Sequence, residues 1–138
     1  MEEINMEILP IPIRELLTYA TSANKIDEEY KLYQEKENRK LYGYKQVEQF
    51  VGCIGVELTM GNTCTIRQIA VSPSERGRGI GERMIDFIND HHSLSIISAE
   101  TDQDAVDFYK KMGFTITSLG EKYPGVERFY CEFLKTDK

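Results

Sequence analysis

The chain has 138 residues, with 17 Lys plus Arg against 23 Asp plus Glu, a formal net charge of −6. This length suits one domain of ordinary size, so we predict a single domain over residues 1–138. The acidic balance argues against a protein whose main partner is nucleic acid, because such proteins usually carry a basic surplus. We expect a cytoplasmic protein without a membrane anchor, because residues 1–5 lack a basic start and no apolar stretch reaches the roughly 18 residues of a membrane span.

Few residues suit a disulfide framework or a metal site. Cys53, Cys64 and Cys131 are an odd number without a CxxC pair, which is typical of buried thiols in a reducing compartment. His91 and His92 are adjacent and have no ligand partners at metal-binding spacing, so we expect no metal site. A helix C-terminus suits these two side chains, because its dipole favours cations.

The hydrophobic pattern predicts two helices near the start of the chain, after one strand. Apolar residues alternate over 4–10 and predict the strand, which the prolines end. Pro12 is suited to the first turn of a helix. A second helix is expected to begin near Asn24, whose side chain would cap it together with Asp27.

From Lys40 onward the apolar residues recur at every second position, which predicts strands over 41–44, 50–60 and 63–71. The later elements are a helix from Ile80, a strand over 94–99, a helix capped by Thr101 and Asp104 and ended by Gly113, and strands over 114–118 and 126–134. This order predicts a mixed α/β domain.

The segment Gly61–Asn62 lies between two of these strands and predicts a hairpin with a two-residue type II′ turn. With such a turn, Cys53 faces Ala70 and Cys64 faces Thr59. The two thiols would therefore not pair across the hairpin.

Three alternating glycines, Gly77, Gly79 and Gly81, occupy a strand–loop–helix junction. Glycines there expose backbone N–H groups to an anion, and the helix that follows directs its positive dipole end to the same place. Arg76 and Arg78 would add charge-assisted bonds to phosphate. The segment therefore predicts a binding site for a diphosphate. The alternative is a flexible loop, flanked by arginines, that only caps the helix and binds no diphosphate.

The two common nucleotide-binding motifs do not fit this loop. The glycine spacing is GxGxG and not the GxGxxG of a dinucleotide-binding turn, and no Lys-Ser or Lys-Thr follows as in a P-loop. The diphosphate must therefore belong to another kind of ligand.

Two segments resemble the GNAT superfamily of N-acetyltransferases. Residues 68–81 are similar to its acetyl-CoA-binding signature, and Arg76, Gly79 and Gly81 meet the core pattern [Arg/Gln]-x-x-Gly-x-[Gly/Ala]. Residues 105–114 resemble a second block, A-x-x-F-Y-x-K-x-G-F. The resemblance is strong over 50–114 and extends elsewhere only to the order of elements.

The resemblance implies a central, mostly antiparallel twisted sheet flanked by helices, with a splayed strand pair where the cofactor binds. The pantetheine arm would lie along the strand that ends at Val71, and the pyrophosphate would lie on the glycine loop. The cofactor-binding residues it implies are Ile69, Ala70, Val71, Arg76, Gly77, Arg78, Gly79, Ile80, Gly81, Asp102 and Phe108.

The resemblance also assigns catalytic roles. Tyr109 occupies the position of a tyrosine that protonates the departing CoA thiolate, and the alternative for it is a core aromatic residue. Thr65 stands where some members carry a glutamate that acts as base, so the acceptor amine would lose its proton to another carboxylate or to water relayed to solvent. Glu100 is our first candidate and Glu57 our second, and either is alternatively a paired or solvated surface group. Asp102 replaces the usual asparagine and alternatively caps the next helix.

The predicted function is therefore an N-acetyltransferase that moves an acetyl group from acetyl-CoA to a primary amine by direct attack. A non-catalytic acyl-CoA-binding module of the same fold is the alternative. The expected partners are acetyl-CoA and an amine acceptor, with no nucleic acid and no membrane, and an exposed edge strand leaves a homodimer open.

Overall fold

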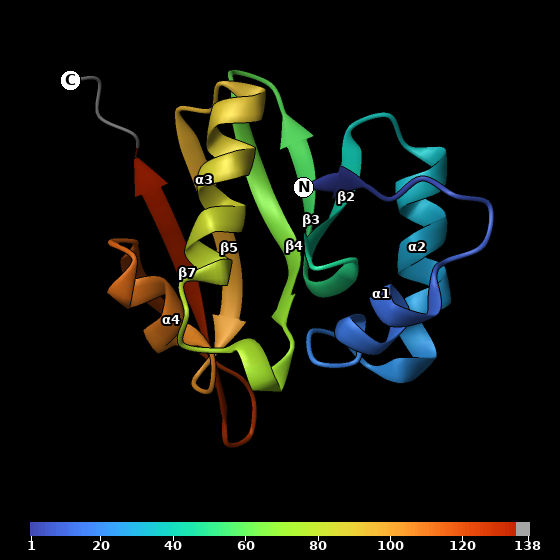
Figure 1. Ribbon diagram of the computed structural model, residues 1–138. Helices are drawn as coiled ribbons and strands as arrows, with labels where there is room; N and C mark the ends of the chain where they lie inside the picture. Colours follow the sequence, from blue (N-terminus) through green and yellow to red (C-terminus); the bar gives the residue numbers. More distant parts are fainter. Residues whose placement is uncertain (135–138) are drawn as a thin grey trace.

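Figure 1 shows the computed structural model, which describes residues 1–134; the last four residues of the predicted 1–138 domain lie outside them. The elements are β1 (Glu2–Glu3), α1 (Ile11–Leu17), α2 (Ile26–Glu35), β2 (Arg39–Gln46), β3 (Gln49–Thr59), β4 (Thr63–Val71), α3 (Ile80–His92), β5 (Ile96–Asp102), α4 (Val106–Lys111), β6 (Thr115–Tyr123) and β7 (Val126–Leu134). Short 3₁₀ turns lie at Ala23–Lys25 and Pro73–Glu75.

The described strands form one seven-stranded sheet in the order β1-β2-β3-β4-β5-β7-β6. Only β4 and β5 run parallel, and the other neighbours are antiparallel. The predicted mixed α/β, mostly antiparallel fold is therefore confirmed. In the described part of the chain, no helix is long and apolar enough to cross a lipid bilayer.

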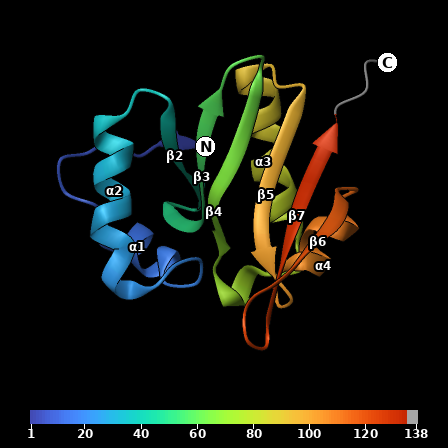
Figure 2. The ribbon, with the colours of Figure 1, turned by 180° about the vertical axis from the view of Figure 1, so that it is seen from behind.

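The sheet has an apolar core on each face, because successive side chains of a strand point to opposite sides. Tyr42 and Ile54 belong to the core beneath α3 and α4, whereas their neighbours Leu41 and Cys53 belong to the core beneath α1 and α2. In Figure 1, α3 lies in front of β4 and β5, and in Figure 2 it lies behind them. The site described below opens between these two layers of helices.

The three cysteines are free and buried, as predicted. Burial raises the pKa of the Cys53 and Cys64 thiols to about 12, so both stay protonated at neutral pH. Their packing is that of small apolar side chains.

The predicted first strand over 4–10 is wrong. Only Glu2–Glu3 forms a strand, although the Ile4 amide still donates to the Leu41 carbonyl at 2.7 Å. Ile4 and Leu9 are buried while Ile8 is 81% exposed, so the alternation does not place one set of residues on one face. The second helix also differs, because α2 begins after a 3₁₀ turn and without a side-chain hydrogen bond from Asn24.

The β3–β4 hairpin has a different turn from the one predicted. Gly61 and Asn62 both have positive φ, +82° and +59°, which a type II′ turn does not allow at the second position. Thr59 faces Thr63, so Cys64 faces Leu58 and not Thr59. Asparagine tolerates the left-handed conformation, and this permits the changed turn.

Farther from the turn the predicted register returns, because β4 contains a bulge. Cys53 faces Ala70 as expected, and the register changes between Gly55, opposite Gln68, and Val56, opposite Ile66. Arg67 is thus the extra residue of a β-bulge. A bulge bends its strand and increases the local twist.

The strands β4 and β5 separate at this bulge. Within the described residues their pairing runs from Thr63–Ile96 to Ile66–Ala99 and then stops, although both strands continue. The β5-facing edge of β4 therefore has no neighbouring strand from Arg67 onward. The predicted splayed strand pair is present, and it creates the site.

Candidate cofactor-binding and active site

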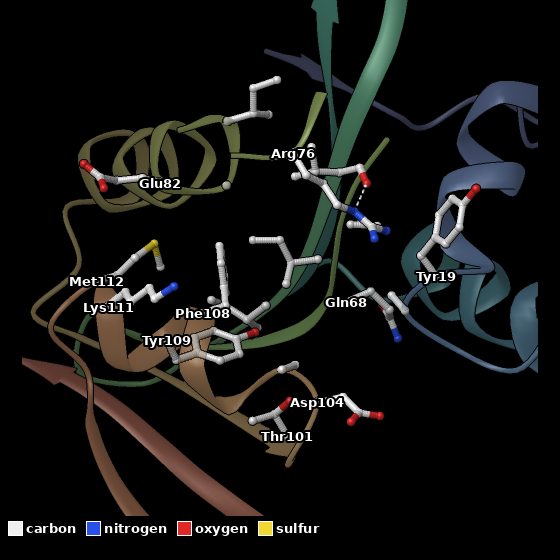
Figure 3. A pocket seen from close by; sticks show the side chains of 18 of the residues that line it. Tyr19, Gln68, Arg76, Glu82, Thr101, Asp104, Phe108, Tyr109, Lys111 and Met112 are labelled. Carbon is white, nitrogen blue, oxygen red and sulfur yellow. Dashed lines mark hydrogen bonds between the residues drawn. The ribbon is translucent and has the colours of Figure 1, made fainter. Parts of the chain in front are cut away.

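A cavity of about 870 Å³ fills the gap between the separated halves of β4 and β5. Figure 3 shows it from close by, with side chains from the segment after α1 and from β4, the glycine loop, α3, β5 and α4 around it. The residues that line it are Tyr19, Ala20, Ile66, Arg67, Gln68, Ile69, Ala70, Val71, Glu75, Arg76, Gly77, Gly79, Ile80, Gly81, Glu82, Glu100, Thr101, Asp102, Asp104, Ala105, Phe108, Tyr109, Lys111, Met112 and Arg128. All the site residues predicted from the sequence lie in this lining except Arg78 and the second candidate base, Glu57.

The glycine loop forms one end of the cavity. Gly77 and Gly79 have φ of +80° and +81°, a region that favours glycine, and a Cβ at Gly77 would meet open space. Gly79 is the N-cap of α3, and no side chain of the described residues caps this helix start. The first backbone N–H groups of a 13-residue helix therefore remain available at the cavity, where they suit an anion.

Gly81 has a different role from the other two glycines. It lies in the first turn of α3, and a Cβ there would be 2.6 Å from the Phe108 ring. Phe108 thus packs directly against the helix backbone. This glycine lets α3 and α4 approach each other, and the approach forms the wall beside the glycine loop.

The two arginines of the loop have different surroundings. Arg76 Nε donates to the Val71 carbonyl at 3.0 Å, and its guanidinium carbon lies 5.1 Å from the centre of the Tyr19 ring (Figure 3). Arg78 lies outside the cavity lining, where its side chain is 68% exposed and 3.5 Å from Glu75. Arg76 therefore bridges the end of β4 and the end of α1.

Tyr109 is buried, with 4% of its surface exposed, and lines the cavity. Its ring packs edge-on against Phe108 and Phe114, at 5.1 and 5.2 Å between ring centres. In Figure 3 the hydroxyl points away from α4 toward the middle of the cavity. Burial raises the pKa of Tyr109 well above its ordinary value, so the phenol stays protonated.

The two carboxylates considered as bases lie in different places. Glu100 is exposed, lines the cavity and lies 4.0 Å from Arg128. Glu57 is outside the lining, and a hydrogen bond from Arg67 lowers the pKa of its carboxyl, which makes it a weaker base. Thr65 forms a 3.2 Å hydrogen bond with Ser98.

Asp102 lines the cavity and also shapes the turn before α4. Its Oδ1 accepts the backbone N–H groups of Asp104 at 3.0 Å and Ala105 at 3.2 Å. The predicted cap by Thr101 is wrong, because Thr101 lies within β5. Gly113 has φ of +95° just after α4, as predicted for a helix end.

The sequence interpretation missed several residues that line the cavity. Tyr19 follows α1 and is 56% exposed, whereas Gln68, on β4, is buried. Lys111 lies in the second block, and Arg128 reaches the cavity from β7. Sequence spacing holds no signal for Tyr19 or Arg128, because both lie outside the two motifs and far along the chain from the glycine loop. Among residues 1–134, no group of three or more His, Cys, Asp or Glu side chains could hold a metal ion.

The family model of the acetyltransferase (GNAT) domain matches residues 37–116, more than half of the chain. The matched segment contains β4, the glycine loop, α3, β5 and α4, which together form most of the cavity. The chain belongs to the GNAT acetyltransferase family.

The chain is also similar in sequence to a bacterial protein named as an N-acetyltransferase. An uncharacterized N-acetyltransferase encoded in the lysA 3′ region of Bacillus methanolicus is 35% identical over 66 residues, which are 48% of this chain and 55% of that protein. The chain thus spans about half the length of that relative.

Two solved structures are similar to this chain in their fold. A candidate GNAT-family acetyltransferase of Desulfovibrio desulfuricans has a TM-score of 0.78 with 14% identity, over 96% of each chain. A candidate streptothricin acetyltransferase of Bacillus anthracis, in complex with acetyl coenzyme A, has a TM-score of 0.68 with 25% identity, over 78% of this chain and 69% of that chain.

Proposed function

We propose that this protein binds acetyl-CoA in the cavity between β4 and β5 and transfers its acetyl group to a primary amine. The observation that carries the proposal is the combination of an uncapped α3 start, two glycines of positive φ and the open edge of β4 at one cavity. The acetyl-CoA complex of the Bacillus anthracis protein supports the choice of cosubstrate.

The residues fit the parts of acetyl-CoA in a definite order. The amides from Gly77 to Glu82 suit the pyrophosphate, because backbone N–H groups and the helix dipole favour negative charge. The open edge of β4 over Ile69–Val71 offers backbone groups to the amides of the pantetheine arm, as a neighbouring strand would. With the cofactor bound in this order, we expect the thioester to lie near Tyr109, whose side chain lines the cavity.

Acetyl-CoA supplies the acetyl group as a thioester, and the amine attacks its carbonyl carbon directly. Tyr109 donates its phenolic proton to the sulfur that leaves. Its raised pKa keeps the proton in place at neutral pH, so the donor is present before attack. The proton of the amine leaves to Glu100 or to water, because Thr65 has no basic group and Glu57 lies outside the cavity.

A non-catalytic acyl-CoA-binding module is the second candidate. The observation that favours it is the hydroxyl of Thr65, bonded to Ser98, at the position where relatives place a glutamate. Such a module would use the same cofactor cavity but would lack turnover.

The test combines binding and turnover. Isothermal titration should detect acetyl-CoA binding, and release of the CoA thiol should exceed hydrolysis for at least one member of a panel of polyamines, aminoglycosides, amino acids and peptides. Binding without turnover for any amine would favour the non-catalytic module. Absence of binding would contradict both candidates.

A further inference from the structure

Four polar side chains connect α2 to the middle of β4, and we call Glu29, Tyr33, Arg39 and Gln68 the α2–β4 cluster. Three of them are buried, and the side chain of Glu29 is 26% exposed. The Tyr33 hydroxyl donates to Gln68 Oε1, and Gln68 Nε2 donates to Glu29 Oε1 at 2.7 Å. Arg39 donates to the same carboxylate oxygen at 2.9 Å. Because a carboxylate only accepts, the Gln68 amide has one orientation, with its carbonyl toward Tyr33.

The backbone makes room for this cluster. A Cβ at Gly55 would overlap the Tyr33 hydroxyl, so Tyr33 reaches across β3 only because residue 55 is glycine. The guanidinium of Arg39 lies 4.6 Å from the centre of the Tyr33 ring. Tyr33, Arg39 and Gln68 are each less than a tenth exposed, and a buried network of this kind holds its members in one arrangement when its bonds are made.

The cluster contacts β4 at the bulge. Gln68 directly follows the extra residue Arg67, and the separation of β4 from β5 begins at the same place. Arg67 Nε in turn donates to Glu57 at 2.9 Å on the exposed side. Two successive residues of the bulge are therefore bonded to different elements, Arg67 to β3 and Gln68 to α2.

We propose that Glu29 and Tyr33 are positioning residues that hold Gln68, and with it the bulge, so that Ile69–Val71 stay apart from β5. The inference rests on the proposed function, in which Ile69–Val71 bind the pantetheine arm. Buried backbone groups favour pairing, so a released β4 would close toward β5 or lose a defined position. Either change would weaken cofactor binding.

Tyr33→Phe tests the inference, because Tyr33 lies outside the cavity lining and cannot act by touching the cofactor. Isothermal titration should show acetyl-CoA affinity reduced by about five- to tenfold, since a buried hydrogen-bond partner is lost. Tyr30→Phe is the matched control. It removes a buried tyrosine hydroxyl from the same helix, bonded to the Met6 carbonyl at 2.5 Å, and should leave affinity unchanged.

A double variant shows whether the effect passes through Gln68. Gln68→Leu should weaken binding, and adding Tyr33→Phe to it should weaken binding no further. If Tyr33→Phe does not fold, Glu29→Ala, which removes the acceptor of Gln68 Nε2 and also lies outside the cavity lining, replaces it in the titration.

The outcomes separate the two proposals. Wild-type affinity in Tyr33→Phe, with an unfolding temperature lowered as in Tyr30→Phe, would overturn the positioning role and leave the proposed function standing. A further loss in the double variant would overturn the route through Gln68. Absence of acetyl-CoA binding by the wild-type protein would overturn the proposed function and this inference together.

Discussion

The cofactor wall of the cavity, from β4 through the glycine loop to α3, is built from residues close together in the sequence, whereas the wall beside α1 and α2 is built by contacts between distant segments. Gly77, Gly79 and the α3 start need only their local backbone to present an anion site. Tyr19 reaches the cavity by stacking with Arg76, and α2 influences it through Gln68. A change in the first wall should therefore affect cofactor binding directly, and a change in the second should act through packing.

Gly79→Asp should have the largest effect. It places a carboxylate at the helix start that would receive the pyrophosphate, and it forces a φ of +81° on a residue with a side chain. Acetyl-CoA affinity in titration should fall by about 100-fold or more, on the scale of a lost charge-assisted site. Gly61→Asp is the control, because Gly61 has φ of +82° but lies in the β3–β4 turn, away from the cavity. Similar losses in both variants would contradict a local phosphate site.

Tyr109→Phe should come next, with an effect on turnover. We expect kcat to fall by about 100-fold, the lower range for loss of a general acid, with KM for acetyl-CoA changed by less than about threefold. Steady-state kinetics with a working amine would measure both. Tyr130→Phe removes a hydroxyl bonded to Glu132 outside the cavity and should keep wild-type turnover. Unchanged kcat in Tyr109→Phe would assign Tyr109 to the core alone.

Gly81→Ala should affect stability more than chemistry. The added methyl group would meet the Phe108 ring at 2.6 Å, and overpacking of this kind costs about 1–3 kcal/mol. Urea unfolding should show this loss. Phe108→Leu in the same chain should restore part of it, because the shorter side chain leaves room. If the losses of unfolding free energy from Gly81→Ala and Phe108→Leu simply added in the double variant, the Phe108 ring would not limit the space at residue 81.

Glu57→Gln should have the smallest effect. Its effect on the free energy of unfolding should depend on pH. The hydrogen bond from Arg67 lowers the pKa of Glu57 in the folded protein. The pair therefore stabilises the folded protein at pH above the unfolded-state pKa of about 4.3. This stabilisation is lost as the pH falls through the folded-state pKa. Because the pair is partly exposed, the difference in unfolding free energy from wild type should be below about 1 kcal/mol at pH 7 and should shrink as the pH falls below the unfolded-state value. Glu35→Gln, from an exposed pair with Lys31, is the control. A difference that stays constant as the pH falls below the unfolded-state value would contradict the ion-pair explanation.

Much of the fold follows from the sequence where the pattern is local. The alternation over Thr63–Val71 and Val126–Leu134 predicts both strands with their observed bounds. The same reasoning fails at 4–10, because burial of Ile4 and Leu9 follows from contacts with other segments and not from alternation. It also fails at the β3–β4 turn, where Gly61 and Asn62 allow more than one turn type and only the paired strands select the register.

The chemistry of the glycine loop and the order of the elements follow from the sequence, because glycine conformation and apolar period are properties of neighbouring residues. The opening of the sheet follows only from the folded structure. The end of pairing at Ile66–Ala99 and the hydrogen bonds of Tyr33 and Glu29 with Gln68 join residues more than 30 positions apart. The bulge at Arg67 depends on the pairing of β3 with β4. Such contacts form only when separate elements pack together, so no local pattern in the sequence contains them.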